Sequence, residues 1–227
     1  MSRLPLAKLR SRLALDYRAM HSLRGATLGR IEAFVSPLDL ERRREATDAE
    51  GLDGLATVYR VEFRFRMLLT PDRELQQARA IFETSPHGYP FVAPRVAFAS
   101  DAIPFSPHIQ RGSGMVCLGE AWTRARGNWL LPHLVIHVMK LANFDEPCTR
   151  DGFDRNAVNY ARYTLEGRPL NPDLDYPVVD ERITHSGSVP AADPPAPVFR
   201  RSSGFAPRSV AAAPVEQVVF APRPRLL

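Results

Sequence analysis

The sequence has few cysteines and lacks any long apolar run. Only two of its 227 residues are cysteine, Cys117 and Cys148, which excludes the disulfide framework that stabilises many small secreted proteins. No apolar stretch reaches the roughly 18 residues that cross a bilayer, and the N-terminus lacks the apolar core of a secretory signal. These absences predict a protein of the reducing cytoplasm that does not bind membranes.

A broad basic surface is also missing, although the net charge is +5. Residues 195–227 contain five arginines and one glutamate, so this segment alone contributes +4. The remaining chain is close to neutral, and aromatic residues do not alternate with the arginines as a base-stacking surface requires. We therefore expect no nucleic-acid partner.

Three segments have the pattern of helices. Residues 4–21 carry apolar side chains at steps of three and four. A largely apolar helix begins at Pro132, a residue that suits the first helical turn. Its polar stripe contains His133 and His137, but no third ligand accompanies them, so neither a metal nor another cofactor is expected. Asp154 is placed to cap a last helix.

Four segments predict strands, at residues 28–36, 59–67, 78–84 and 95–100. The clearest is 59–67, where apolar residues alternate with charged ones, so that one face is buried and the other is wet. The last two strands are separated by a proline-rich turn. The signals indicate an α+β protein with a four-stranded antiparallel sheet.

The composition changes near residue 171. Ten of the 21 prolines fall in residues 171–227, where they disfavour helices and inner strands. We predict a domain at residues 1–168 and a Pro/Arg-rich, mostly disordered tail at 169–227. Short apolar clusters in the tail, such as Val218-Val219-Phe220, leave two interpretations open: docking motifs or a passive tail.

Cys117 stands in the segment most suggestive of chemistry. It follows a glycine-rich turn that ends in Gly114-Met-Val-Cys117-Leu118, and Pro107-His108 lies nine to ten residues upstream. Trp129 and the apolar helix come after it. This order suggests a thiol that carries a group rather than one that fills space.

The order of these elements resembles that of a ubiquitin-conjugating enzyme, an E2, over roughly residues 4–165. Tyr89-Pro-Phe91 and Pro94 match the Tyr-Pro-Phe-x-x-Pro turn of that family, and residues 114–118 match its Gly-x-x-Cys-Leu active-site segment. Trp129 matches the tryptophan that opens its crossover helix. The resemblance implies a UBC-like fold: an N-terminal helix, a four-stranded antiparallel meander, an active-site loop, a crossover helix and a C-terminal helix.

Two motifs depart from the family. Its His-Pro-Asn triplet is replaced by Ser106-Pro107-His108, and Leu130-Leu131-Pro132 stands where many members have the Ser-Pro-Ala that helps to recognise ligases. The richness in Ala, Arg and Pro is similar to that of E2-like proteins from bacterial ubiquitin-like conjugation operons. Several such operons act in antiphage defence.

The resemblance implies specific roles for residues. Cys117 would accept a ubiquitin-like modifier from an E1-like activating enzyme as a thioester and pass it to an amine of a target protein. His108 would either support the oxyanion or brace the loop. An acidic residue would assist the incoming lysine, and the candidates are Asp145, Glu146, Asp151 and Asp154.

The basic side chains of the first helix have two interpretations. Lys8, Arg10 and Arg12 form either a solvated face or, as the resemblance implies, the docking surface for the E1. Cys148 is interpreted as an incidental thiol, with a regulatory or resolving role as the alternative.

Two other functions remain open. A catalytically inactive interaction module of the same fold is favoured by the missing asparagine and disfavoured by the retained cysteine. A cysteine hydrolase would pair Cys117 with His87, His108 or His133, but no local signature supplies the orienting acid that such an enzyme needs.

Overall fold

The computed structural model describes residues 5–47, 53, 55–85, 88–125, 128–145, 152–180 and 182–183. Their helices and strands are, in chain order, α1 (Leu6–Ser22), β1 (Leu28–Phe34), α2 (Pro37–Glu41), β2 (Val58–Phe63), β3 (Met67–Thr70), β4 (Arg73–Leu75), β5 (Ala78–Glu83), β6 (Arg95–Phe98), α4 (Ala121–Ala125), α5 (Leu131–Ala142) and α6 (Arg155–Tyr163). The α+β class is confirmed. None of the described helices is long and apolar enough to cross a membrane.

The main sheet has four antiparallel strands, as predicted, and their order is β1-β2-β5-β6. The expected strand at 59–67 is divided, however. β2 pairs with β5 only as far as Phe63 opposite Ala78, and β3 then pairs with β4 in a separate hairpin. The apolar alternation continues across the break because Phe65 and Met67 are also buried, so the pattern alone did not reveal the division.

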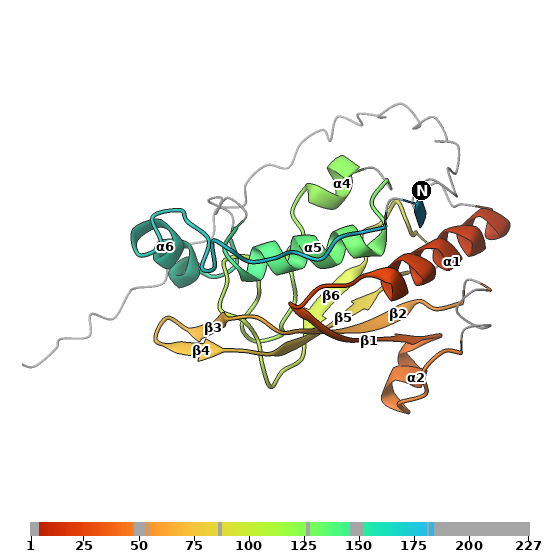
Figure 1. The fold of residues 1–227 in the computed structure, drawn as a ribbon, viewed down its shortest axis with the longest axis horizontal. Helices are drawn as coiled ribbons and strands as arrows, with labels where there is room; N and C mark the ends of the chain where they lie inside the picture. The colour runs from red at the N-terminus through yellow and green to blue at the C-terminus, as the bar shows by residue number, and fades with distance from the viewer. Residues whose placement is uncertain are drawn as a thin grey trace, which may run out of the picture. The chain divides into compact units, whose positions relative to one another are not determined.

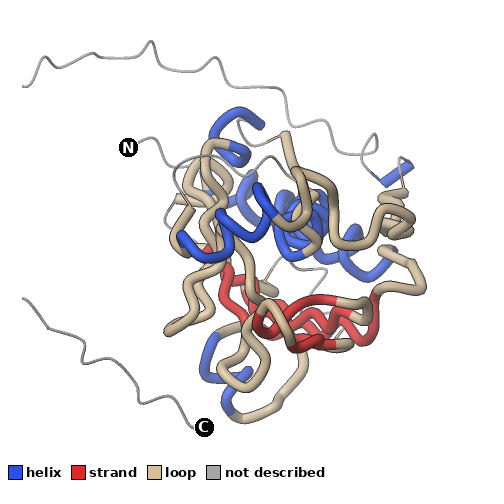
Figure 2. The backbone as a smooth tube through the Cα atoms, turned by 90° about the vertical axis from the view of Figure 1, so that its left-hand side faces the viewer, coloured by secondary structure: helices blue, strands red, loops and turns tan. Residues whose placement is uncertain are grey.

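Helices α1 and α5 cover one face of this sheet, and α2 lies on the other side (Figures 1 and 2). The predicted apolar positions of α1 explain its place, because Leu9, Leu13, Tyr17 and Met20 are buried in the main core. α5 is buried over most of its length. Burial of its leucines and valines contributes about 1.5–3 kcal/mol for each fully buried side chain.

Helix α6 begins where the sequence predicted, and Asp154 caps it. One carboxylate oxygen of Asp154 accepts hydrogen bonds from the backbone of Asn156 at 2.9 Å and of Ala157 at 3.2 Å. The buried face of α6 packs against β3 and the end of α5 in a second apolar cluster formed by Leu68, Phe105, Phe144, Ala157, Ala161 and Leu170. This cluster joins α6 to the segment that leads to Cys117.

The chain after residue 168 does not separate from the body where the sequence placed the boundary. The chain divides into the units Met1–Pro190 and Ala191–Leu227, and described residues occur only in the first. Asn171 donates to Asn143 at 2.9 Å, and Thr27 donates to the Asp175 carbonyl at 3.0 Å. Val178 forms a β-bridge with Arg24. Leu170 is buried in the second apolar cluster, and Leu174, Tyr176 and Val179 pack against the main core. Composition did not show these contacts because the proline content dominated it. The predicted disorder of residues 184–227 lies outside the described residues.

Candidate functional site

Backbone pairing fixes the position of Cys117. The segment 109–116 folds back on itself, with a bridge between Ile109 and Val116 and another between Met115 and Ala97 of β6. Beyond this turn the Cys117 amide donates to the His108 carbonyl at 2.7 Å. The structure therefore brings the two predicted residues together, and the link that it shows is a backbone one. The Cys117 side chain is half-buried.

Gly114 is required by the close approach of this turn to β6. Its φ is +68°, a region that residues with a Cβ rarely adopt. An added Cβ would overlap the Phe98 carbonyl oxygen and lie 3.1 Å from that residue's carbonyl carbon and amide nitrogen. The Phe98 amide also donates to the Gly114 carbonyl at 2.9 Å, so moving the turn away from β6 would break this hydrogen bond. The positive φ and the close approach to β6 thus explain why glycine stands three residues before Cys117.

Ser106 holds the His108 loop against α5. Its hydroxyl donates to the Leu141 carbonyl at 2.8 Å and accepts from the His108 amide at 3.4 Å. The serine is completely buried, whereas His108 is half-buried. The first residue of the substituted triplet therefore serves as an anchor, and the imidazole of the third lies nearer the surface.

Asp154 is the acidic candidate that contacts the His108 loop. Its amide donates to the Pro107 carbonyl at 3.3 Å, and an added Cβ on nearby Gly152 would lie 2.9 Å from that same oxygen. Asp145 is exposed and accepts a hydrogen bond from Tyr176 at 2.8 Å. The other two acidic candidates, Glu146 and Asp151, lie outside the described residues, as do Cys148 and His87.

Arg111 and Asp154 both line an open groove of about 500 Å³. The Arg111 guanidinium lies 3.8 Å from the second Asp154 oxygen, donates to the Leu69 carbonyl at 3.2 Å and stacks 5.4 Å from the Phe105 ring. That second Asp154 oxygen is shielded from solvent and accepts no hydrogen bond from a described residue. The groove is lined by residues 110–112 and 153–156.

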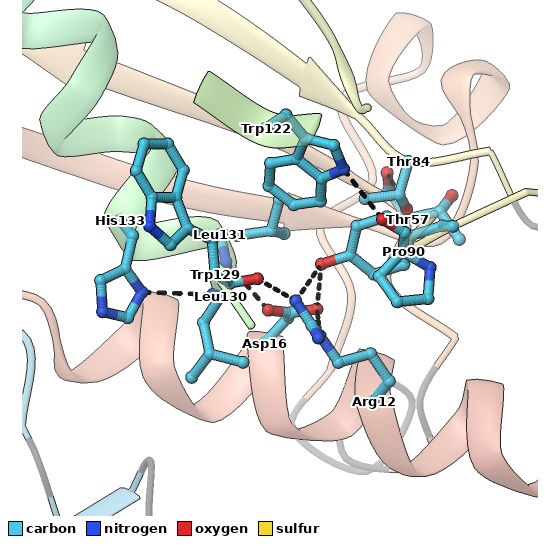
Figure 3. Close-up of polar contacts among 11 residues, drawn as sticks. Arg12, Asp16, Thr57, Thr84, Pro90, Trp122, Trp129, Leu130, Leu131 and His133 are labelled. Atoms are coloured by element: carbon cyan, nitrogen blue, oxygen red, sulfur yellow. Dashed lines mark hydrogen bonds and ion pairs between the residues drawn. The ribbon is translucent and has the colours of Figure 1, made fainter. Parts of the chain in front are cut away.

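A tryptophan that the sequence did not single out anchors the chain just after Cys117. The Trp122 indole donates to the Pro90 carbonyl at 2.8 Å (Figure 3). Its ring lies 5.9 Å from the Tyr89 ring. Trp122 is 2% exposed. The Tyr-Pro-Phe turn is therefore joined to the cysteine segment through Trp122, whereas Trp129, the predicted match, is half-buried at the entry to α5.

The predicted E1-docking role of Arg12 is wrong for this residue, although Lys8 and Arg10 are exposed. Arg12 is 7% exposed and pairs at 2.9 Å with Asp16, which is fully buried. The Arg12 guanidinium also donates to Tyr89 and to the Trp129 carbonyl. A side chain that is enclosed in this way does not reach a partner.

This cluster joins α1 to the start of α5 (Figure 3). The Asp16 carboxylate accepts from the Leu131 amide at 2.9 Å and from the Tyr89 hydroxyl. Burial raises the pKa of Asp16 above its usual value, and Arg12 opposes that rise. Burial also raises the pKa of Tyr89 well above its usual value. The sequence contained a signal, because Asp16 occupies the helical face of Leu9, Leu13 and Met20.

The two histidines of α5 contact residues at the entry to that helix. His133 accepts a hydrogen bond from the Leu130 amide at 3.2 Å, and burial lowers its pKa. The His137 ring lies 5.5 Å from the Trp129 ring. Within the described residues, no cluster of three or more His, Cys, Asp or Glu side chains suited to a metal occurs.

A comparison with solved structures finds chains that are partly similar to this one. A solved chain described as "Novel Ubiquitin-Conjugating Enzyme" is similar to this one, with a TM-score of 0.42 and 18% sequence identity. The likeness covers 72% of this chain and 94% of the other. No family model and no curated protein matches the sequence. The function proposed below therefore rests on the residues and their geometry.

Proposed function

We propose that this chain is an E2-like conjugating enzyme that carries a ubiquitin-like modifier on Cys117. The observation that carries the proposal is the backbone bond between Cys117 and His108, which joins the only described cysteine to the loop of the substituted triplet. The Asp154 amide donates a hydrogen bond to the Pro107 carbonyl of the same loop. Backbone hydrogen bonds thus join the segments that carry a half-buried thiol, a histidine and a carboxylate.

The proposed reaction has two acyl transfers. In the first, the Cys117 thiolate attacks the carbonyl carbon of a modifier thioester on the E1-like enzyme, and the E1 thiol leaves. In the second, a target amine attacks the same carbonyl carbon, the carbon–sulfur bond breaks, and the amine proton passes to water or to a nearby base. Sulfur suits both steps because it is a good nucleophile and a good leaving group. ATP is consumed by the E1 before these steps.

His108 is the residue that we assign to the second step. The carbonyl oxygen gains negative charge as the amine attacks, and an imidazole N–H aimed at it supplies the donor that the family's asparagine would provide. Loss of one such donor costs about 2.7–4 kcal/mol in other acyl-transfer enzymes. Of the acidic candidates that the structure describes, Asp154 is the one whose backbone is hydrogen-bonded to the His108 loop, although one of its carboxylate oxygens caps α6.

The partners of this proposal are an E1-like enzyme, a ubiquitin-like protein and a target protein, with the exposed Lys8 and Arg10 as docking residues for the E1. The corresponding setting is the bacterial cytoplasm, in antiphage defence. An inactive interaction module is the second candidate function, and it predicts the same docking without any adduct on Cys117.

The direct test supplies an activating enzyme, ATP and a ubiquitin-like protein from the same genome. We expect an adduct on the wild-type protein that a thiol reductant removes, and none on Cys117→Ala. Cys117→Ser should trap an ester that resists the reductant. Cys148→Ala is the matched control and should load normally. An adduct that persists in Cys117→Ala would contradict the proposal.

The role of His108 is separable from that of Cys117. His108→Ala should load to the same extent, because the E1 supplies the hydrogen-bond donor to the oxyanion while the modifier passes from one thiol to the other. Discharge to free lysine should then slow by about a hundredfold or more. Equal losses in loading and discharge would instead assign His108 to bracing the loop.

A further inference from the structure

His108 and Cys117 form a cross-strand pair in the turn before the cysteine. The antiparallel bridge between Ile109 and Val116 sets the register of this turn. The next residues along it are His108 and Cys117, and the backbone hydrogen bond between them measures 2.7 Å. Directly opposite residues of an antiparallel pair point to the same face, with Cβ atoms about 4.5–5.5 Å apart. The imidazole and the thiol therefore extend from neighbouring positions on one face of the turn.

The burial of these residues agrees with the register. Ile109 and Val116, which point to the opposite face, are 0% and 7% exposed and pack in the main core. His108 and Cys117 are half-buried, as expected for a face that solvent reaches. A small acceptor can therefore approach both side chains from the same side.

The histidine at position 108 has a property that the family's asparagine lacks. An asparagine amide donates and accepts hydrogen bonds, but it does not take up a proton under ordinary conditions. A neutral imidazole has one N–H donor and one basic nitrogen. The oxyanion role proposed above uses only the donor. The basic nitrogen beside Cys117 adds the kind of group that activates hydroxyl nucleophiles in other acyl-transfer enzymes.

Acceptor groups differ in how much they need such a base. An unprotonated amine attacks a thioester with its lone pair and loses its proton afterwards. A neutral hydroxyl is a weaker nucleophile, and it reacts well only when a base removes its proton during the attack. A thioester that has an imidazole beside its sulfur is therefore suited to hydroxyl acceptors.

We propose that Cys117 also transfers the modifier to alcohol hydroxyl groups, with His108 as the general base, an inference that rests on the proposed conjugating function. The hydroxyl oxygen attacks the thioester carbonyl carbon while the hydroxyl proton passes to the imidazole. The carbon–sulfur bond then breaks, and the departing Cys117 sulfur takes the proton from the imidazolium. The products are an ester of the modifier and the free thiol, and the histidine is neutral again.

The test follows single-turnover loss of the modifier from loaded Cys117. The acceptors are glycerol and two peptides that differ in one residue, a serine in the first and a lysine in the second. The wild type should form an ester with a hydroxyl acceptor faster than it loses the modifier to water. The ester resists a thiol reductant and is cleaved by alkaline hydroxylamine, whereas the lysine product resists both. An ester with the peptide places the acceptor in a protein, and an ester with glycerol alone places it in a small alcohol; either supports the inference.

Replacement of His108 by asparagine separates the base from the hydrogen-bond donor. His108→Asn should keep discharge to lysine within about twofold, because the amide still donates to the oxyanion. Discharge to the hydroxyl acceptor should fall by about a hundredfold to ten-thousandfold, the usual contribution of a general base. Retained use of lysine shows that the variant is folded. Gln110→Ala is the matched control, since Gln110 is exposed on the same face of the turn, and it should keep both rates.

Loss of the modifier to water and lysine only, with no ester on either alcohol, would overturn the inference. An equal fall of the hydroxyl and lysine rates in His108→Asn would also overturn it, because the base would then have no separate role. Failure of the E1-like enzyme to load Cys117 would overturn the proposed function instead. The inference is then decided on protein loaded by exchange with a synthetic peptide thioester. Faster ester formation by the wild type than by His108→Asn supports it there, and equal rates refute it.

Discussion

Three glycines near Cys117 differ in what a methyl group would meet. Gly112 has no atom within 4 Å of an added Cβ, and its φ lies outside the left-handed range. Gly119 has a φ of +54° with open space around it. Gly114 combines a φ of +68° with overlap on the backbone of β6. Substituting each by alanine therefore separates backbone strain from steric overlap.

The expected costs follow from these environments. Gly112→Ala should leave stability unchanged or raise it by about 0.4–1 kcal/mol, because alanine restricts the unfolded chain. Gly119→Ala should cost about 1–2 kcal/mol for its left-handed backbone. Gly114→Ala adds the overlap with β6, which we set at the usual cost of overpacking, so its total is about 2–5 kcal/mol.

Urea denaturation at one protein concentration measures all three free energies of unfolding. Loading of Cys117 measures the functional consequence, since movement of the turn away from β6 disturbs the pairing that positions the thiol. We expect loading to fall for Gly114→Ala and to persist for Gly112→Ala. The reasoning is refuted if Gly114→Ala is no less stable than Gly119→Ala, because the overlap with Phe98 would then cost nothing.

Three further predictions concern buried polar contacts. Arg12→Met should lower the free energy of unfolding by about 3–5 kcal/mol at neutral pH, because it leaves the Asp16 carboxylate buried without its cation. The pKa of Asp16 is already raised and would rise further in this variant. Urea unfolding should therefore show a smaller loss of stability as the pH falls through the pKa of Asp16, because the protonated carboxyl needs no cation. Trp122→Phe should cost at least about 1–3 kcal/mol in thermal unfolding, because the buried carbonyl that the indole meets is left unpaired. The hydrogen bond from Arg60 lowers the pKa of Glu32. This carboxylate therefore stabilises the fold above its unfolded pKa, and the stabilisation is lost as the pH falls through its folded pKa. Glu32→Gln should flatten the acid limb of the stability–pH curve, and an unchanged limb would contradict that assignment.

Much of the fold was predictable because burial imposes a regular period. The apolar positions of α1 and α5 recur at the helical step, and those of β2 alternate, so the elements and the antiparallel sheet follow from the sequence. The cap of α6 was also predictable, because the carboxylate of Asp154 satisfies amides that any helix start leaves unpaired. The turn at Gly114 was predictable too, because a glycine shortly before the cysteine indicated a tight turn.

Contacts between distant polar groups were not predictable in the same way. The period of α1 included Asp16 on its buried face, but nothing local showed that Tyr89 and Leu131 would surround it. Arg12 therefore looked like a surface charge. The contacts of residues 171–178 with the body were not predicted for a related reason. They combine asparagine, threonine and backbone atoms with isolated apolar residues, Leu174 and Tyr176, that follow no helical or strand period. The groove depends on the approach of residues 153–156 to residues 110–112, which lie over 40 residues away in sequence.

The most direct test of the account is to locate the modifier on the loaded protein. Digestion under non-reducing conditions followed by mass spectrometry should find the C-terminal residues of the modifier on the sulfur of Cys117, in a bond that hydroxylamine or a thiol cleaves. No attachment should be found at Cys148. A modifier found on Cys148 or on a lysine, with Cys117 unmodified under conditions that charge the activating enzyme, would contradict the claim that Cys117 is the carrier.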